Sequence, residues 1–373
     1  MHGPTLVTDR ALGPDLARGF MLLFIALANS HYFLRGSSVL GGYPQEGTAV
    51  DSAVIWLLST FVDGRAFPLF GLLFGYGVAR IADRQRWRGP RGVRWLLWRR
   101  AAVLIAVGLV DAMLFYVGDI LAMYGVLLIA GAWLVHRRDR WLLVVAVALT
   151  ALNAIPSADL STVSAAGPDP SMLPPDPVAM VIHRLPVALV IALVGPLGFA
   201  APFAVGLWAG RRRILERPPR WLTTVAAGGI GAAVLGAQPI ALALAGAVAP
   251  PGRAVFEALG ALHATTGLLG GFGYAAAAAL LASRLARRPG RVTTAIAATG
   301  QRSMSCYLLQ SVTWAVVFTP FLLDLSGALS VTTTALLATA TWAATVVLAD
   351  RMRRAGQRGP FETLVRRVTY GTW

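Results

Sequence analysis

The sequence contains no lysine, so all 33 of its basic residues are arginine, and it contains a single cysteine, Cys306. The missing lysine excludes Schiff-base chemistry and a P-loop, because both need a lysine amine. One cysteine excludes an intrachain disulfide and a thiolate metal cluster, and we interpret Cys306 as a packed thiol in an apolar segment. No HExxH, GxSxG or CxxC motif occurs, and five histidines in five segments offer no metal-ligand spacing. The sequence therefore predicts no bound metal.

Charged residues are scarce, at 13% of the chain, whereas hydrophobic residues make up 56%. A soluble domain carries about 25% charged residues. The long apolar runs instead predict an all-α, multi-pass bundle that forms one transmembrane domain over residues 1–373 in a cell membrane. We expect about ten spans, near residues 16–34, 66–82, 96–116, 119–135, 141–156, 185–209, 221–247, 259–282, 302–322 and 329–349.

The arginines gather between the apolar runs, in the connectors 80–100, 136–140, 211–220, 284–291 and 351–358. With ten spans, all five connectors fall on one side, and the positive-inside rule then places both termini in the cytoplasm. The net charge of +16 is thus a topology signal, and no nucleic-acid partner is expected. Two further segments are assigned outside the spans, an interfacial helix at 51–63 and an external Pro-rich loop at 157–184.

Two carboxylates, Asp111 and Asp119, interrupt the apolar stretch 101–135. A carboxylate inside a spanning helix costs about 2.5–3.5 kcal/mol even on the lenient insertion scale, so each needs an explanation. Gly118 followed by Asp119 also fits an ordinary turn, with a left-handed glycine and then a helix N-cap. Capping does not explain Asp111, which needs a partner, a proton or water, and Arg65 has a suitable depth to supply positive charge.

Other polar residues share faces of predicted helices. Arg18 and Asn29 are eleven residues apart, which puts them on one face of the first helix, about 16 Å apart along its axis. Arg18 could instead snorkel to lipid phosphates, and Asn29 could hydrogen-bond a neighbouring helix. Tyr307 and Gln310 belong to a polar-aromatic face that also holds Ser303 and Trp314, and we expect this face to point inward.

Two histidines, His31 and His263, are predicted to lie level with each other in the outer half. His31 is a bystander at the interface in one interpretation and a general base in the other, for which the pKa of an imidazole is suitable. His263 lies on a helix face of small residues, Thr266, Gly267, Gly270 and Gly271, which is typical of close helix packing.

Five stretches, in order along nearly the whole chain, resemble motifs of the YeiB-like DUF418 membrane proteins. LARGFMLLFIALAN, with Asp15 three residues before Arg18, resembles their LDxxRGxxxxxxxxxN opening, and FPLFGLLFGYGVA at 67–79 resembles their second motif. GLVDAMLFYVGDILAMYGV resembles their GLLHxxxxxxGDILxxYAL segment. GQRSMSCYLLQS at 300–311 and GPFETLVRRVTYG at 359–371 resemble their two C-terminal signatures.

The family is related to the transmembrane acyltransferase superfamily, including the acyltransferase-3 group and the lysosomal heparan glucosaminide N-acetyltransferase. The resemblance implies ten to eleven helices that move an acyl group from a cytosolic thioester to an acceptor on the far side. Two positions depart from these relatives. Asn29 stands where acyltransferase-3 proteins have a histidine, and His31 could replace it only if the helix unwinds there. Asp111 stands where the DUF418 motif usually has histidine, although a carboxylate can also accept a proton.

The leading hypothesis is an acyl or group transferase with acyl-CoA as donor. Arg18 would hold an anionic group of the donor, while Asn29, Tyr307 and Gln310 orient the thioester carbonyl. Asp119 or His31 would deprotonate a hydroxyl or amine acceptor, with Asp111 tuning that base. Arg65 and His263 complete the predicted substrate-binding set from the outer half.

Two other classes of function remain open from the sequence. A proton-coupled permease or exporter would use the intramembrane carboxylates as proton relays. A noncatalytic membrane component would act through partners and need the carboxylates for folding or assembly alone. The partners expected are membrane lipids, a small-molecule, lipid or glycan acceptor, and a second copy of the chain in a homodimer.

Overall fold

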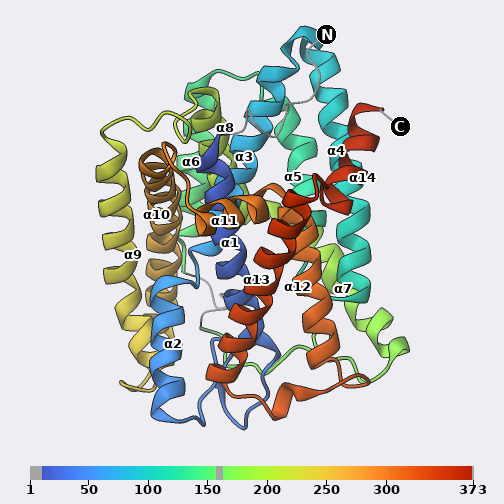
Figure 1. Cartoon of the computed structure of the whole chain (residues 1–373). Coiled ribbons are helices and arrows are strands. Elements are labelled where there is room, and N and C mark those ends of the chain that lie inside the picture. Colours follow the sequence, from blue (N-terminus) through green and yellow to red (C-terminus); the bar gives the residue numbers. More distant parts are fainter. Residues whose placement is uncertain (1–10, 157–162, 372–373) are drawn as a thin grey trace.

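The computed structural model describes residues 11–156 and 163–371, and nearly all of their regular structure is α-helical (Figure 1). The α-helices are α1 (Leu12–Ser30), α2 (Ala49–Phe61), α3 (Ala66–Arg84), α4 (Gly89–Leu114), α5 (Leu121–Leu134), α6 (Asp139–Asn153), α7 (Pro177–Val194), α8 (Pro196–Arg211), α9 (Leu222–Leu244), α10 (Arg253–Leu285), α11 (Arg291–Gln301), α12 (Ser303–Phe318), α13 (Val331–Arg354) and α14 (Pro360–Tyr370). Shorter elements are the 3-10 turns η2 (His31–Phe33), η3 (Arg86–Arg88) and η5 (Leu325–Gly327), and the antiparallel strands β1 (Val39–Leu40) and β2 (Tyr43–Pro44).

Within the described ranges, six helical stretches are long and apolar enough to cross a membrane. They are Leu12–Phe33, Ala49–Arg84, Pro177–Arg211, Leu222–Leu244, Arg253–Leu285 and Val331–Arg354, and Leu121–Leu134 and Ser303–Phe318 are shorter apolar helices. The predicted all-α bundle is therefore confirmed, and it contains six candidate membrane-crossing stretches within the described ranges. The total of about ten spans and the cytoplasmic side of the termini stay predictions.

Two breaks between consecutive helices are buried inside the bundle. The turn between α2 and α3 contains Gly64, whose φ of +73° suits glycine, and the fully buried Arg65. The turn between α4 and α5, residues 115–120, is also buried at Tyr116 and Asp119. Neighbouring helices and loops cover this turn, so both breaks supply polar groups to the protein interior.

The predicted span 185–209 is two helices, because Gly195 and Pro196 separate α7 from α8. Pro196 has no N–H to continue the ladder of α7 and stands at the first position of α8, where that group is not needed. The predicted Pro-rich loop also ends earlier than 184, since Asp176 accepts hydrogen bonds from Val178 N and Ala179 N and begins α7 at Pro177. Residues 157–162 of that loop lie outside the described residues.

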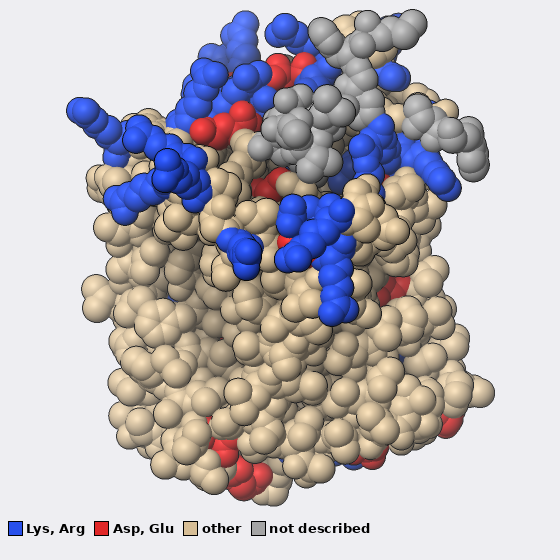
Figure 2. Space-filling view, in the orientation of Figure 1, with Lys and Arg blue, Asp and Glu red and all other residues tan. Residues whose placement is uncertain are grey.

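Arginine side chains gather at one end of the molecule (Figure 2). The first turn of α1 lies there, because Gly13 faces Leu215 of the connector 211–220. The last helix, α14, packs on α4 and α12 near the same end (Figure 1). Acidic side chains mark the opposite end of the view in Figure 2. Helix α2 stands beside α9 (Figure 1) and packs against α9 and α13; its interfacial location stays a prediction.

Candidate functional site

Asp111 and Asp119 meet in a buried cluster that α12 completes. Asp111 comes from the last turn of α4 and Asp119 from the turn before α5. Their carboxyl groups adjoin, near enough to share a hydrogen bond. Ser311 Oγ donates to Asp111 Oδ2 at 2.9 Å, and the backbone N–H of Ile120 donates to Tyr307 Oη at 3.3 Å. We call Asp111, Asp119, Tyr307 and Ser311 the carboxyl cluster.

Asp119 is both a helix cap and a member of this pair. Its Oδ2 accepts a hydrogen bond from Ala122 N at 2.8 Å, which satisfies a donor in the first turn of α5. Gly108 in α4 makes room for this contact, because a Cβ there would come within 3.0 Å of both Ala122 N and Asp119 Oδ2. The expected left-handed glycine is absent, since the φ of Gly118 is not positive. Gly118 instead leaves room for the ring of Tyr116.

The cationic neighbour of Asp111 is Arg184, and Arg65 does not contact it. Arg184 on α7 is buried, donates from Nε to Ser171 O at 3.0 Å and from Nη1 to Met113 O at 3.3 Å, and interacts electrostatically with Asp111. No ion pair within 4.0 Å joins them. The Oδ1 atoms of Asp111 and Asp119 are buried and have no hydrogen-bond partner in the described chain. The hydroxyl group of Tyr307 lies near the carboxyl group of Asp119 and interacts with it. Repulsion between two adjacent buried carboxylates favours a state in which the pair shares one proton.

Arg65 and His263 form a second buried cluster, at the break between α2 and α3. His263 Nε2 lies 2.6 Å from Arg65 Nη1 and 2.9 Å from Ser59 O. Arg65 Nη2 donates to Ala233 O at 2.7 Å, and Nη1 also donates to Asp63 O. The structure thus brings together two of the predicted substrate-binding residues. Arg65 is held here by α9 and α10, which explains why it is not available to Asp111.

His31 lies beside this second cluster, in a stack of aromatic rings. The α-helical geometry of α1 ends at Ser30, and His31 begins the tighter η2 turn, so the chain does change its winding at this residue. The His31 ring stacks on Tyr43 with centroids 4.0 Å apart, and Tyr43 Oη donates to Asp63 Oδ2 at 2.6 Å. Neither ring nitrogen of His31 has a hydrogen-bond partner in the described chain.

Tyrosine side chains connect the two clusters. Tyr116, in the buried turn before α5, interacts electrostatically with Asp111, Asp119 and Tyr32. Tyr32 in turn interacts with Tyr43 and packs against His31 with ring centroids 4.2 Å apart. We call Tyr116, Tyr32 and Tyr43 the tyrosine link. Polar groups therefore extend from the carboxyl cluster to Asp63.

The remaining predicted residues on α1 and α12 lie elsewhere in the bundle. Asn29 is buried. Gln310 is buried too and donates from Nε2 to Leu22 O at 3.2 Å, which ties α12 to α1. Arg18 lies near the arginine-rich end, with its side chain one quarter exposed. The i, i+3 pair with Asp15 forms as the spacing predicts, at 3.4 Å.

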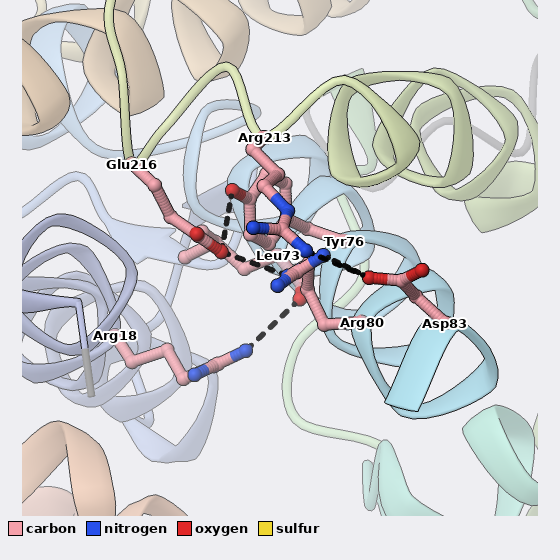
Figure 3. A network of polar contacts seen from close by, with 7 residues as sticks. All are labelled: Arg18, Leu73, Tyr76, Arg80, Asp83, Arg213 and Glu216. Carbon is pink, nitrogen blue, oxygen red and sulfur yellow. Dashed lines mark hydrogen bonds and ion pairs between the residues drawn. The ribbon is translucent and has the colours of Figure 1, made fainter. Parts of the chain in front are cut away.

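Arg18 borders a polar network between α3 and the connector 211–220 (Figure 3). Arg18 Nη2 donates to Leu73 O at 3.3 Å. Ion pairs join Arg80 to Glu216 at 2.8 Å and Arg213 to Asp83 at 3.1 Å. The ion pairs tie the end of α3 to the connector 211–220, and Arg18 ties α1 to α3 beside them.

Asp139, at the start of α6, also forms ion pairs with arginines of the connector 211–220. These ion pairs make the stability of the protein depend on pH. The Asp139 carboxylate accepts from Arg211 Nη1 at 2.6 Å and pairs with Arg212. Partial burial by itself would raise the pKa of Asp139, but the hydrogen bonds from Arg211 and Arg212 outweigh it and hold that pKa below the usual 3.8. A carboxylate with a depressed folded-state pKa stabilises the protein above its unfolded-state pKa, and the effect is lost as the pH falls below about 4.

We therefore expect thermal unfolding of the wild-type protein to lose more stability between pH 7 and pH 3 than unfolding of Asp139→Asn. The midpoints of the two proteins, measured in the same detergent, should converge at the lower pH. A gap that stays constant across this range would contradict the assignment.

Six residues near the clusters were missed from the sequence: Ser311, Arg184, Tyr43, Asp63, Tyr116 and Tyr32. Ser311 carried a usable signal, because it follows Tyr307 by four residues and therefore shares its helix face. Arg184 lay at the edge of a predicted loop, and nothing in its neighbours pointed to Asp111. In the part of the chain that the structure describes, no three His, Cys, Asp or Glu side chains lie together in a way that could hold a metal ion.

The fold is that of an α-helical bundle with six candidate membrane-crossing stretches in the described ranges. Residues 209–372 match the family described as "Protein of unknown function (DUF418)". The resemblance inferred from the motifs is thereby confirmed over this part of the chain, which contains the motifs at 300–311 and 359–371. A stretch of 159 residues is 32% identical to the uncharacterized protein YxaH of Bacillus subtilis (strain 168). That match spans 41% of this chain and 39% of YxaH.

Proposed function

We propose that this protein is a membrane-embedded acyltransferase that uses the carboxyl cluster as its acid–base group. The observation that carries the proposal is the adjacency of two buried carboxyl groups, Asp111 and Asp119, with Oδ1 atoms that the surrounding chain leaves without hydrogen-bond donors. A structural pair would be expected to have those oxygens satisfied, because an unpaired buried polar atom costs free energy. Such a pair can accept one proton and return it, as acyl transfer requires.

The proposed reaction moves an acyl group from a thioester to a hydroxyl or amine. The ionised carboxylate of the pair accepts the proton of the acceptor as its oxygen or nitrogen bonds to the acyl carbon. The carbon–sulfur bond then breaks, and the pair returns one proton to the departing thiolate, which leaves as a free thiol. Atoms and charge balance, and the cluster ends in its initial protonation state.

Other residues would act on the substrates rather than on the proton. Tyr307 Oη lies at the cluster and could donate to a carbonyl oxygen that gains negative charge during transfer. Arg18 at the arginine-rich end would attract an anionic part of the donor, such as the phosphates of acyl-CoA. Arg65, His263 and His31 would contribute to an acceptor region on the other side of the tyrosine link.

The transferase proposal is tested by the mass of the products. Purified protein in lipid vesicles is supplied with lauroyl-CoA or acetyl-CoA together with a lipid and glycan extract of the producing cells. We expect release of free thiol and an extract component whose mass increases by the corresponding acyl group. Unchanged masses and no thiol release, with folded protein present, would contradict the proposal.

A proton-coupled permease is the second candidate, and the tyrosine link favours it. The tyrosine link would carry protons between the carboxyl cluster and Asp63 along a transport route, and its Tyr43 Oη donates a hydrogen bond to Asp63 Oδ2 at 2.6 Å. The same vesicles separate the two functions, because a permease relocates a labelled solute with unchanged mass and acidifies or alkalinises the lumen. A transferase changes the mass of its acceptor.

A further inference from the structure

A largely apolar groove leads from the carboxyl cluster along the flank of the bundle. It lies between α4, α12, α13 and α14 and has a volume of about 540 Å³, within the usual range for small-molecule sites. Asp111 lines the groove, and Arg302 and Pro360 line it near the start of α12 and α14. The walls between them are mostly apolar, with Val110, Leu308, Leu309, Val312 and Phe361 among the lining residues.

We propose that this groove holds the alkyl chain of the acyl group that is transferred, so that the substrate class is a long-chain or medium-chain acyl donor. This inference rests on the proposed acyltransferase function. The carbonyl end of the chain would lie at Asp111, and the methyl end would extend toward Cys306 and Phe361.

The chemistry of the lining favours an alkyl chain over the other parts of an acyl thioester. A pantetheine arm carries two amides, which need hydrogen-bond partners when they leave water. The lining side chains with polar heads are few, namely Asp111, Arg302 and Ser305. Ser305 already donates to Glu362, and Arg302 donates to the carbonyl oxygens of Ala298 and Gln357. An alkyl chain instead gains free energy from every apolar contact, at about 25 cal/mol per Å².

The groove is open toward the surroundings on one side. Val110 and Leu309 stand on its two walls and are 54% and 38% exposed, so an acyl chain can enter sideways from the bilayer. The end near Phe361 is fixed, because Glu362 of α14 accepts a hydrogen bond from Met304 N at 2.8 Å. Ten residues of α12 separate Arg302 from Val312, a length of about 15 Å.

Photolabelling tests the site without requiring turnover. The full-length protein in nanodiscs is exposed to lauroyl-CoA that carries a diazirine near the end of the acyl chain, and labelled peptides are identified by mass spectrometry. We expect labels on α4 and α12. Leu309→Trp, and separately Val110→Trp, should reduce labelling about tenfold, which corresponds to ~1.4 kcal/mol of binding free energy. The matched control is Leu336→Trp on α13, because Leu336 is 64% exposed and does not line the groove.

The outcomes separate this inference from the proposed function. Labelling confined to the groove without thiol release would leave the chain-binding site standing and overturn the transferase. Thiol release from acetyl-CoA with groove labelling absent, or equal in Leu309→Trp and Leu336→Trp, would overturn the alkyl-chain site and leave the transferase standing.

A competition with a lipid probe gives a further test. A diazirine phosphatidylglycerol that labels the groove and is not displaced by lauroyl-CoA would also overturn the alkyl-chain site, because the groove would then hold a bilayer lipid. Tryptophan variants are compared only when they elute as folded protein in size-exclusion chromatography.

Discussion

Asp119→Asn is expected to lower acyl-transfer turnover by about 10²–10⁴-fold, the usual contribution of a positioned acid–base group. The expected loss has a simple physical reason, since an amide cannot accept and return the proton of the acceptor. The fold should persist, because the side-chain oxygen of an asparagine can still accept the hydrogen bond from Ala122 N that Asp119 now accepts. Asp111→Asn should have an effect of the same order, because the two carboxyl groups act as one pair.

Thiol release from lauroyl-CoA measures the effect, and thermal unfolding measured alongside shows whether the protein is intact. Asp324→Asn is the matched control, since Asp324 lies in a loop, pairs with Arg35 at 3.3 Å and is remote from the carboxyl cluster. Asparagine also tolerates the left-handed backbone of this residue, whose φ is +44°. Full turnover in Asp119→Asn would refute the catalytic role. Lost folding in both cluster variants, with turnover per folded molecule unchanged, would support a purely structural pair.

Gly108→Ala is expected to cause the largest loss of stability among conservative changes near the site. Its new Cβ would come within 3.0 Å of Ala122 N, Ala122 Cα and Asp119 Oδ2, and two of these atoms belong to the backbone. Real Cβ contacts essentially never come this close, so α4 and α5 must separate. Overpacking of this kind typically costs about 1–3 kcal/mol. The change should also disturb the cap of α5 and therefore reduce turnover.

The control for Gly108→Ala is Gly228→Ala on α9, where a Cβ would meet no atom within 4 Å. Alanine favours a helix interior over glycine by roughly 0.5–1 kcal/mol, so this variant should be neutral or more stable. The unfolding midpoints of both variants are compared with wild type in one detergent. Equal midpoints for Gly108→Ala and Gly228→Ala would show that α4 and α5 do not meet as closely as described.

Part of the candidate site could be predicted from sequence because the cost of burying charge does not depend on the fold. Asp111 and Asp119 stood out in an apolar stretch, and the structure places them side by side. The sequence alone could not decide whether Asp119 is a helix cap or a functional carboxylate. The structure shows the cap, with one carboxylate oxygen on Ala122 N, and leaves the second oxygen facing the pair.

Partners across the bundle could not be predicted, because they depend on how helices pack over long sequence distances. Depth alone suggested Arg65 as the charge near Asp111, but Arg65 contacts His263, and Arg184 lies nearer Asp111. Two residues at equal depth can lie on opposite sides of a bundle. Hydropathy reports depth in the membrane but does not report the position of a residue around the bundle axis. Tyr116 was missed for the same reason, whereas the spacing of Ser311 from Tyr307 offered a signal that was not used.

The sequence by itself determined the helical, membrane-type character of the chain, the arginine-rich connectors and the family resemblance, because these depend on composition, spacing and short motifs. Only the tertiary structure decided where helices stop inside the bundle, as at the turn 115–120 and at Gly195. It also decided which polar groups meet and that a groove adjoins Asp111. Helix packing sets these features, since a buried turn or a groove forms only where neighbouring helices cover some groups and leave others open.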